Sequence, residues 1–75
     1  MTTKRTAPGY YEVTNELGTF AVWRDTPPAD EGYGTRALWF VEWEDGRSCY
    51  LDPSETKRDA MAALASYVTN RTEGN

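Results

Sequence analysis

Residues 37–52, ALWFVEWEDGRSCYLD, decide the fold because they hold two apolar runs on either side of a tight turn. The dipeptide Asp45-Gly46 between the runs is typical of β-hairpins. A two-residue turn would pair Val41 with Tyr50, whereas a type I turn followed by the glycine as a left-handed bulge would pair Val41 with Cys49. A slip of one residue moves every side chain to the other face of the sheet. We expect the bulged register because it places the large apolar residues on one face: Trp39, Val41, Trp43, Cys49 and Leu51.

A second hairpin is expected on the N-terminal side of this stretch. Residues 10–13 (YYEV) and 19–25 (TFAVWRD) alternate in character along the chain, and Asn15 and Gly18 between them favour a tight turn. Pairing Thr14 with Thr19 produces one apolar face, made of Tyr11, Val13, Phe20 and Val22. The opposite face then carries Tyr10, Glu12, Ala21 and Trp23.

The last element is expected to be a helix. Residues 56–59 (TKRD) resemble a capping box, in which the threonine oxygen accepts a free backbone N–H, and residues 52–55 (DPSE) offer a competing start one turn earlier. Apolar side chains then recur at helical spacing, namely Met61, Leu64, Tyr67 and Val68. The sequence therefore predicts an α+β fold, in which a three- to four-stranded antiparallel sheet of two hairpins carries one C-terminal helix on one face.

We expect a single ββββα domain between residues 10 and 70. Residues 1–9 are polar and end in Pro-Gly, so they are predicted to form a flexible arm, and residues 71–75 are predicted to be a frayed tail. Residues 26–36 (TPPADEGYGTR) form one long connection, because its prolines and glycines exclude regular structure there.

The composition of the chain excludes several classes of function. The 75 residues include one cysteine and no histidine, and the net charge is −4. A disulfide within the chain is impossible, and a Cys/His zinc site would lack ligands. We expect a protein that is not an enzyme and uses no cofactor, since Cys49 has no base within sequence reach. The sequence shows no signal peptide and no membrane span, so a cytoplasmic protein is expected.

The aromatic residues supply the candidate site. One helix can cover only one face of the sheet, so the rings of the other face are left over. This candidate contact surface consists of Tyr10, Trp23, Leu38, Phe40 and Tyr50, with Glu42 beside them. Apolar patches that contain Trp and Tyr mark interaction sites, although the long connection or the N-terminal arm could instead fold over these rings. We expect a protein partner, either another protein or a second copy in a homodimer.

A small sheet followed by a threonine-capped helix, YLDPSETKRDAMAAL, resembles AP2-type and integrase-arm DNA-binding domains over residues 38–68. The resemblance implies a sheet that lies in the major groove of DNA. Those families supply Arg and Lys on the outer sheet face, where this chain has Glu12, Glu42 and Glu44. Together with the acidic net charge, this argues against nucleic acid as the partner.

The pattern GxFxV…W, then xDGRxxYLD, then TKRDAxxAL, is similar to short, mostly uncharacterised proteins of actinobacterial phages over residues 10–68. That resemblance implies an accessory protein that binds a host protein. We therefore expect a small non-enzymatic interaction module. The alternative is a nucleic-acid-related module, either an AP2-like sheet binder of DNA or an acidic DNA mimic.

Overall fold

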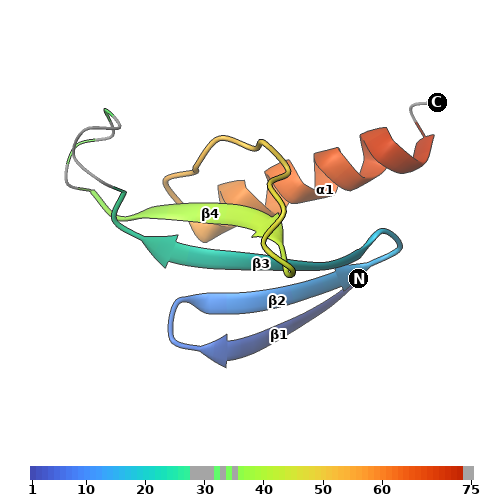
Figure 1. The fold of residues 1–75 in the computed structure, drawn as a ribbon, viewed down its shortest axis with the longest axis horizontal. Coiled ribbons are helices and arrows are strands. Elements are labelled where there is room, and N and C mark those ends of the chain that lie inside the picture. The colour runs from blue at the N-terminus through green and yellow to red at the C-terminus, as the bar shows by residue number, and fades with distance from the viewer. Residues whose placement is uncertain (28–31, 33, 35, 74–75) are drawn as a thin grey trace.

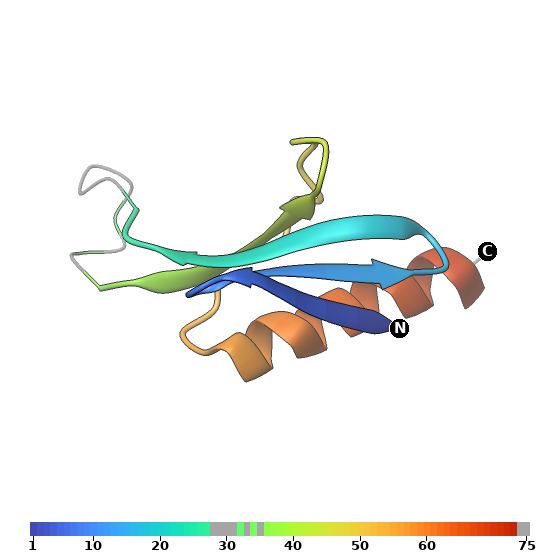
Figure 2. The same cartoon turned by 90° about the horizontal axis from the view of Figure 1, so that it is seen from below.

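The computed structural model describes residues 1–27, 32, 34 and 36–73. Within these residues one antiparallel sheet has the strand order β1-β2-β3-β4, and α1 lies across one of its faces (Figures 1 and 2). The α+β class with two hairpins and a C-terminal helix is thereby confirmed. The elements are β1 (Thr2–Ala7), β2 (Tyr10–Asn15), β3 (Gly18–Asp25), β4 (Leu38–Trp43) and α1 (Lys57–Glu73).

The first strand comes from the segment that we expected to be a flexible arm. Residues 2–7 pair with β2, from Thr2 opposite Thr14 to Ala7 opposite Tyr10, with an irregularity after Arg5. All six side chains of β1 are exposed, so the strand lacks the apolar alternation by which strands are recognised. Its threonines favour extended backbone, and backbone hydrogen bonds to β2 hold it in the sheet.

The bulged register of the central hairpin is confirmed. The Trp43 N–H donates to the Arg47 carbonyl at 3.0 Å, the Gly46 N–H donates to the Trp43 carbonyl at 2.9 Å, and Glu42 forms a bridge with Ser48. Gly46 has a φ of 93°, a value that favours glycine. The turn is also held by the Asp45 carboxylate, which accepts from the Arg47 backbone N–H at 3.1 Å.

The expected fourth strand, residues 47–51, does not form as a regular strand. Tyr50 takes a φ of 57°, which turns the chain out of the ladder after Cys49. The chain rejoins β4 further along, where Ser54 and Trp39 exchange backbone hydrogen bonds of 2.7 and 2.9 Å. The segment between these points runs beside the edge of β4 (Figure 1).

The hairpin of β2 and β3 has the register that the sequence predicted, including Val13 opposite Phe20 and Tyr11 opposite Val22. The Asn15 side-chain oxygen accepts from the Leu17 N–H at 2.9 Å, as an Asx turn requires. A Cβ atom at Gly18 would lie 3.2 Å from the Trp43 ring, and the φ of Gly18 is 138°. Close packing against that ring and the positive φ both explain the glycine.

The core lies between α1 and the sheet face that the helix covers. The Thr56 hydroxyl caps the helix by accepting from the Asp59 N–H at 3.1 Å. The helix continues to Glu73, beyond the predicted start of the frayed tail, and the Thr72 hydroxyl donates to the Val68 carbonyl at 2.9 Å in its last turn. Residues 74 and 75 lie outside the described part. The buried core residues are Val13, Phe20, Val22, Val41, Cys49, Ala60, Leu64 and Val68.

Replacing Gly46 by valine should lower the free energy of unfolding by more than about 1 kcal/mol, because a β-branched residue tolerates a positive φ poorly. Apart from the chain neighbours, no atom of the described residues lies within 4 Å of a Cβ built at this position, so the loss would come from the backbone and not from a clash. Urea denaturation measures the change. Gly46→Asn is the matched control and should lose clearly less, since asparagine adopts positive φ more readily; equal losses would contradict the argument.

Candidate functional site

The face of the sheet opposite α1, the outer face, carries a row of three aromatic rings. Tyr10, Trp23 and Phe40 lie directly opposite one another on β2, β3 and β4. The ring centroids of Tyr10 and Trp23 are 6.3 Å apart with planes at 26°, and those of Trp23 and Phe40 are 5.6 Å apart at 23°. All three side chains are half-buried. We call these three residues the aromatic row.

An acidic row lies beside the aromatic row. Glu12, Ala21 and Glu42 are the next set of directly opposed residues on the same three strands. Both glutamates are half-buried, and Ala21 between them is only 4% exposed. Among the described residues the ion pairs are Arg36 with Glu55 and Arg47 with Asp45, so neither glutamate has a cationic partner there.

Charge differs between the two faces of the sheet. Lys4 lies opposite Glu12 on the outer face, and Asp25 lies opposite Leu38 there. The charged strand residues on the helix-covered face are Arg5, opposite Tyr11, and Arg24, opposite Trp39. The charged strand residues of the outer face are therefore three carboxylates and one ammonium, namely Glu12, Asp25, Glu42 and Lys4.

The structure brings together four of the six predicted contact residues: Tyr10, Trp23, Phe40 and Glu42. Leu38 is on the outer face but only 4% exposed, so it offers almost no surface to a partner. Tyr50 belongs to no strand: its positive φ takes it out of the ladder in which the sequence predicted it to lie, and it is 91% exposed.

Ala21 had no predicted role, although the predicted pairing of Thr14 with Thr19 already placed it opposite Glu12; the pairing of β3 with β4 adds Glu42 on its other side.

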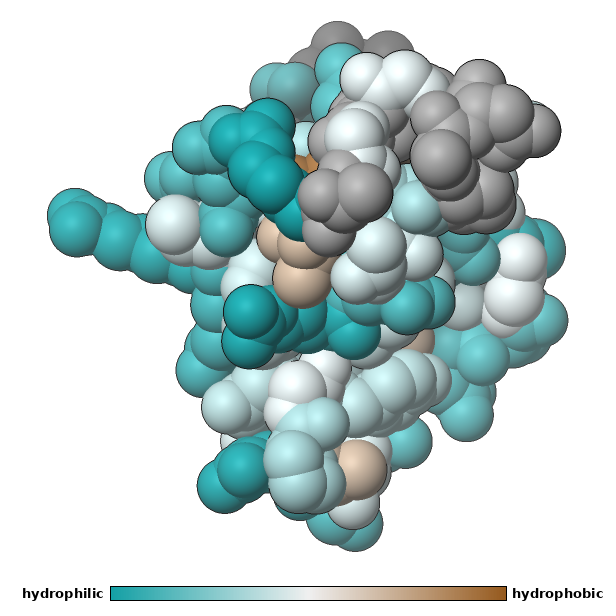
Figure 3. Space-filling model, turned by 90° about the vertical axis from the view of Figure 1, so that its left-hand side faces the viewer, coloured by the Kyte–Doolittle hydropathy of each residue, from teal (hydrophilic) through white to brown (hydrophobic). Residues whose placement is uncertain are grey.

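Whether the connection of residues 26–36 covers the outer face depends mostly on residues outside the described part. At the end of the molecule where β3 ends and β4 begins, hydrophilic residues prevail and hydrophobic colour appears in small separate areas (Figure 3). On the residues coloured in this view, apolar and polar groups are therefore mixed.

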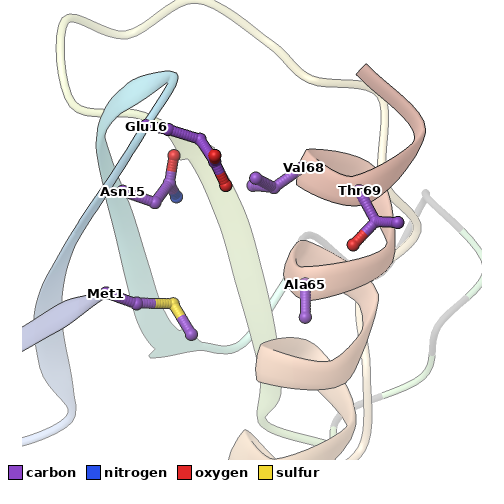
Figure 4. Close-up of a pocket in the computed structure, with 6 residues that line it drawn as sticks. All are labelled: Met1, Asn15, Glu16, Ala65, Val68 and Thr69. Carbon is purple, nitrogen blue, oxygen red and sulfur yellow. The ribbon is translucent and has the colours of Figure 1, made fainter. Parts of the chain in front are cut away.

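A groove of about 380 Å³ lies on the other side of the sheet, between the start of β1, the β2–β3 turn and α1 (Figure 4). The Asn15 side-chain nitrogen is buried there and has no hydrogen-bond partner among the described residues, while the Asn15 oxygen accepts from the Leu17 N–H. The Glu16 carboxylate points toward the helix. The groove thus offers one acidic group and one free amide donor; its lining residues are Met1, Asn15, Glu16, Ala65, Val68 and Thr69.

Cys49 is a packing residue. The thiol is buried in the core and donates to the Val41 carbonyl, with sulfur and oxygen 3.2 Å apart. Burial raises the pKa of the Cys49 thiol above its usual value of 9.0. Neither feature produces the reactive thiolate that nucleophilic or redox chemistry needs.

The Cys49 thiol should react much more slowly with a disulfide reagent at pH 8 in the native protein than in urea, where it is unburied. Burial also makes the folded state favour the protonated thiol. The stability that the protonated Cys49 thiol contributes is fully present below pH 9, and it is lost as the pH rises through the higher pKa of the folded state. Absorbance of the released thiol measures the rate. Similar native and denatured rates would show that Cys49 is accessible.

Comparison of the chain with protein-family models, with curated proteins and with solved structures finds no match in any of the three. The resemblances to phage proteins and to AP2-type domains stay predictions. In the described residues, no group of histidine, cysteine and carboxylate side chains is placed to hold a metal ion. No helix of that same part combines the length and apolar character needed to cross a membrane.

Proposed function

We propose that the protein is a small interaction module that binds a partner protein through the outer face of its sheet. The observation that carries the proposal is the aromatic row, which α1 leaves uncovered on the face opposite the core. Tyr and Trp are the side chains that contribute most to protein–protein binding when a partner buries them. The three residues lie on adjacent strands, which are about 4.8 Å apart, so the row offers a contact across three strands.

Binding suits these residues better than catalysis does. The core already has its own aromatic and aliphatic side chains, so the aromatic row is not needed to fill it. The one thiol is buried, and the chain has no histidine. The proposal is therefore a non-enzymatic module. The resemblance to phage proteins extends it to an accessory protein that acts on a host protein.

The placement of the basic residues favours a protein partner over DNA. Lys4 and Arg5 are neighbours on β1 and so point to opposite faces of the sheet. The Lys57 ammonium lies 3.9 Å from the centre of the Tyr11 ring on the helix side. A phosphate-binding outer face would need Lys and Arg beside the aromatic row, where the strands instead place Glu12 and Glu42.

Changing Phe40 to arginine should abolish capture of the partner from a lysate of the native cells, because the substitution removes one ring of the aromatic row and adds a bulky charge beside Trp23. Ser66→Arg adds the same charge on an exposed position of α1 and should capture as well as the wild type does. Circular dichroism verifies that both variants fold. A partner that is kept by Phe40→Arg would overturn the proposed function.

The protein should not bind duplex DNA with sub-micromolar affinity. The carboxylates of the outer face and the net charge of −4 oppose the approach of phosphates. Fluorescence anisotropy at about 50 mM salt, a concentration that favours phosphate binding, measures the affinity. Tight binding that weakens steeply with added salt would support the AP2-like alternative instead.

A further inference from the structure

We propose that the outer face binds an extended, arginine-bearing segment of its partner, with an arginine seated over Ala21 between Glu12 and Glu42 and against Trp23. This inference rests on the proposed function and names the chemistry of the partner. The evidence comes from the register of the strands, from the pattern of cation–aromatic contacts within the chain, and from the charges of the outer face.

The geometry places two carboxylates on either side of a short side chain. Glu12, Ala21 and Glu42 are directly opposed on three neighbouring strands, so the two glutamate backbones lie about 10 Å apart. Ala21 has only a methyl group and is almost fully covered, so no long side chain of β3 stands between the two glutamates and a guanidinium can reach a carboxylate on each side. Arginine carries five N–H donors in a flat fork and makes paired hydrogen bonds with carboxylates.

The aromatic rings on the two faces of the sheet differ in whether a cation of the chain lies over them. On the helix side, rings are paired with cations of the protein itself: Arg47 lies 4.5 Å from the centre of the Trp43 ring, and Lys57 and Arg71 lie 3.9 and 4.8 Å from those of Tyr11 and Tyr67. In the part of the chain that the structure describes, no cation lies over a ring of the aromatic row. The acidic row beside it also lacks an ion-pair partner there.

An arginine of a partner could contact a ring of the aromatic row and the carboxylates of the acidic row at the same place. Trp23 is in the middle of the aromatic row, and Ala21 is two residues before it on β3, on the same face. A guanidinium above Ala21 therefore reaches the two carboxylates and the edge or face of the indole, where cation–aromatic attraction adds to the ion pairs. Neither interaction is available to an acidic or a purely apolar partner.

A second copy of the chain fits the outer face less well. In a symmetric dimer the same patch faces itself, so the three carboxylates Glu12, Asp25 and Glu42 would face an equally acidic patch in which Lys4 is the one cation among the described strand residues. Like charges opposite one another are destabilising. A basic segment has the complementary charge and also gains from electrostatic steering toward this face.

The test uses the peptide Ac-Gly-Arg-Ala-Arg-Gly-NH2 and the full chain labelled with nitrogen-15. Alternate residues of an extended peptide share a side and are about 7 Å apart, so both arginines can reach the acidic row. Titration at about 20 mM salt should shift the Ala21 amide and the Trp23 indole signals, and it should leave the indole signals of Trp39 and Trp43, on the helix side, in place. A peptide with glutamine in place of arginine should shift neither.

Glu12→Gln and Glu42→Gln should each weaken peptide binding about two- to fivefold, the range that single partly exposed ion pairs cover. Glu16→Gln is the matched control, because it removes the same charge from a carboxylate that points toward α1 (Figure 4). It should change the affinity by less than about 1.5-fold, since its distance leaves only a small electrostatic effect.

Shifts that are absent, or that respond equally to all three glutamine variants, would overturn the arginine proposal. If sedimentation shows that the wild type dimerises and that the two outer-face glutamine variants dimerise more tightly, the occupant is a second copy and the proposal also fails. Neither outcome decides the proposed function, because capture of the partner and its loss in Phe40→Arg test the outer face independently of arginine. A retained partner in Phe40→Arg would instead remove the proposed function itself.

Discussion

The packing of α1 against the face of the sheet that it covers is the interaction on which the rest of the structure depends. Phe20, Leu64, Val13 and Val22 are its largest fully buried side chains, and burying a side chain of that size contributes about 1.5–3 kcal/mol. The chain has one cysteine, so no internal disulfide adds to this core. Because side chains alternate along a strand, docking the helix on one face also decides which residues the other face presents. The aromatic row and the acidic row are the residues that the face opposite α1 presents as a result.

Where local chemistry specifies the backbone, the structure could be predicted from the sequence. The Asp45-Gly46 turn, the Asx turn at Asn15 and the threonine cap at Thr56 each depend on residues within four positions of one another. The register between β2 and β3 followed from the alternation of side chains, which decides the faces, and from the short turn at Asn15 and Gly18, which decides the pairing. Five of the six predicted contact residues lie on one face as expected, and four of them are partly exposed.

The remaining features could not be predicted because they leave no local signal. Strand β1 has no buried side chain, so its pairing with β2 depends on backbone hydrogen bonds that any polar extended segment could make. Tyr50 leaves the ladder through a positive φ that tyrosine rarely adopts, and nothing in the run of residues 47–51 indicates it. The proposed role of Ala21 depends on Glu12 and Glu42, its two neighbours across the sheet. An alanine within one strand does not indicate which residues lie beside it.

The exposure of β1 has a consequence for how the sheet opens. A strand with all six side chains in water can separate from β2 without uncovering the core beneath α1, so its opening costs backbone hydrogen bonds and little apolar surface. Amide protons of β1 should therefore exchange with solvent through a local fluctuation, while those of β3, paired on both sides, need the whole domain to unfold. The outer edge of β1 also keeps unpaired backbone groups, and Lys4 and Arg5 on opposite faces of it discourage the strand from adding to another copy of itself.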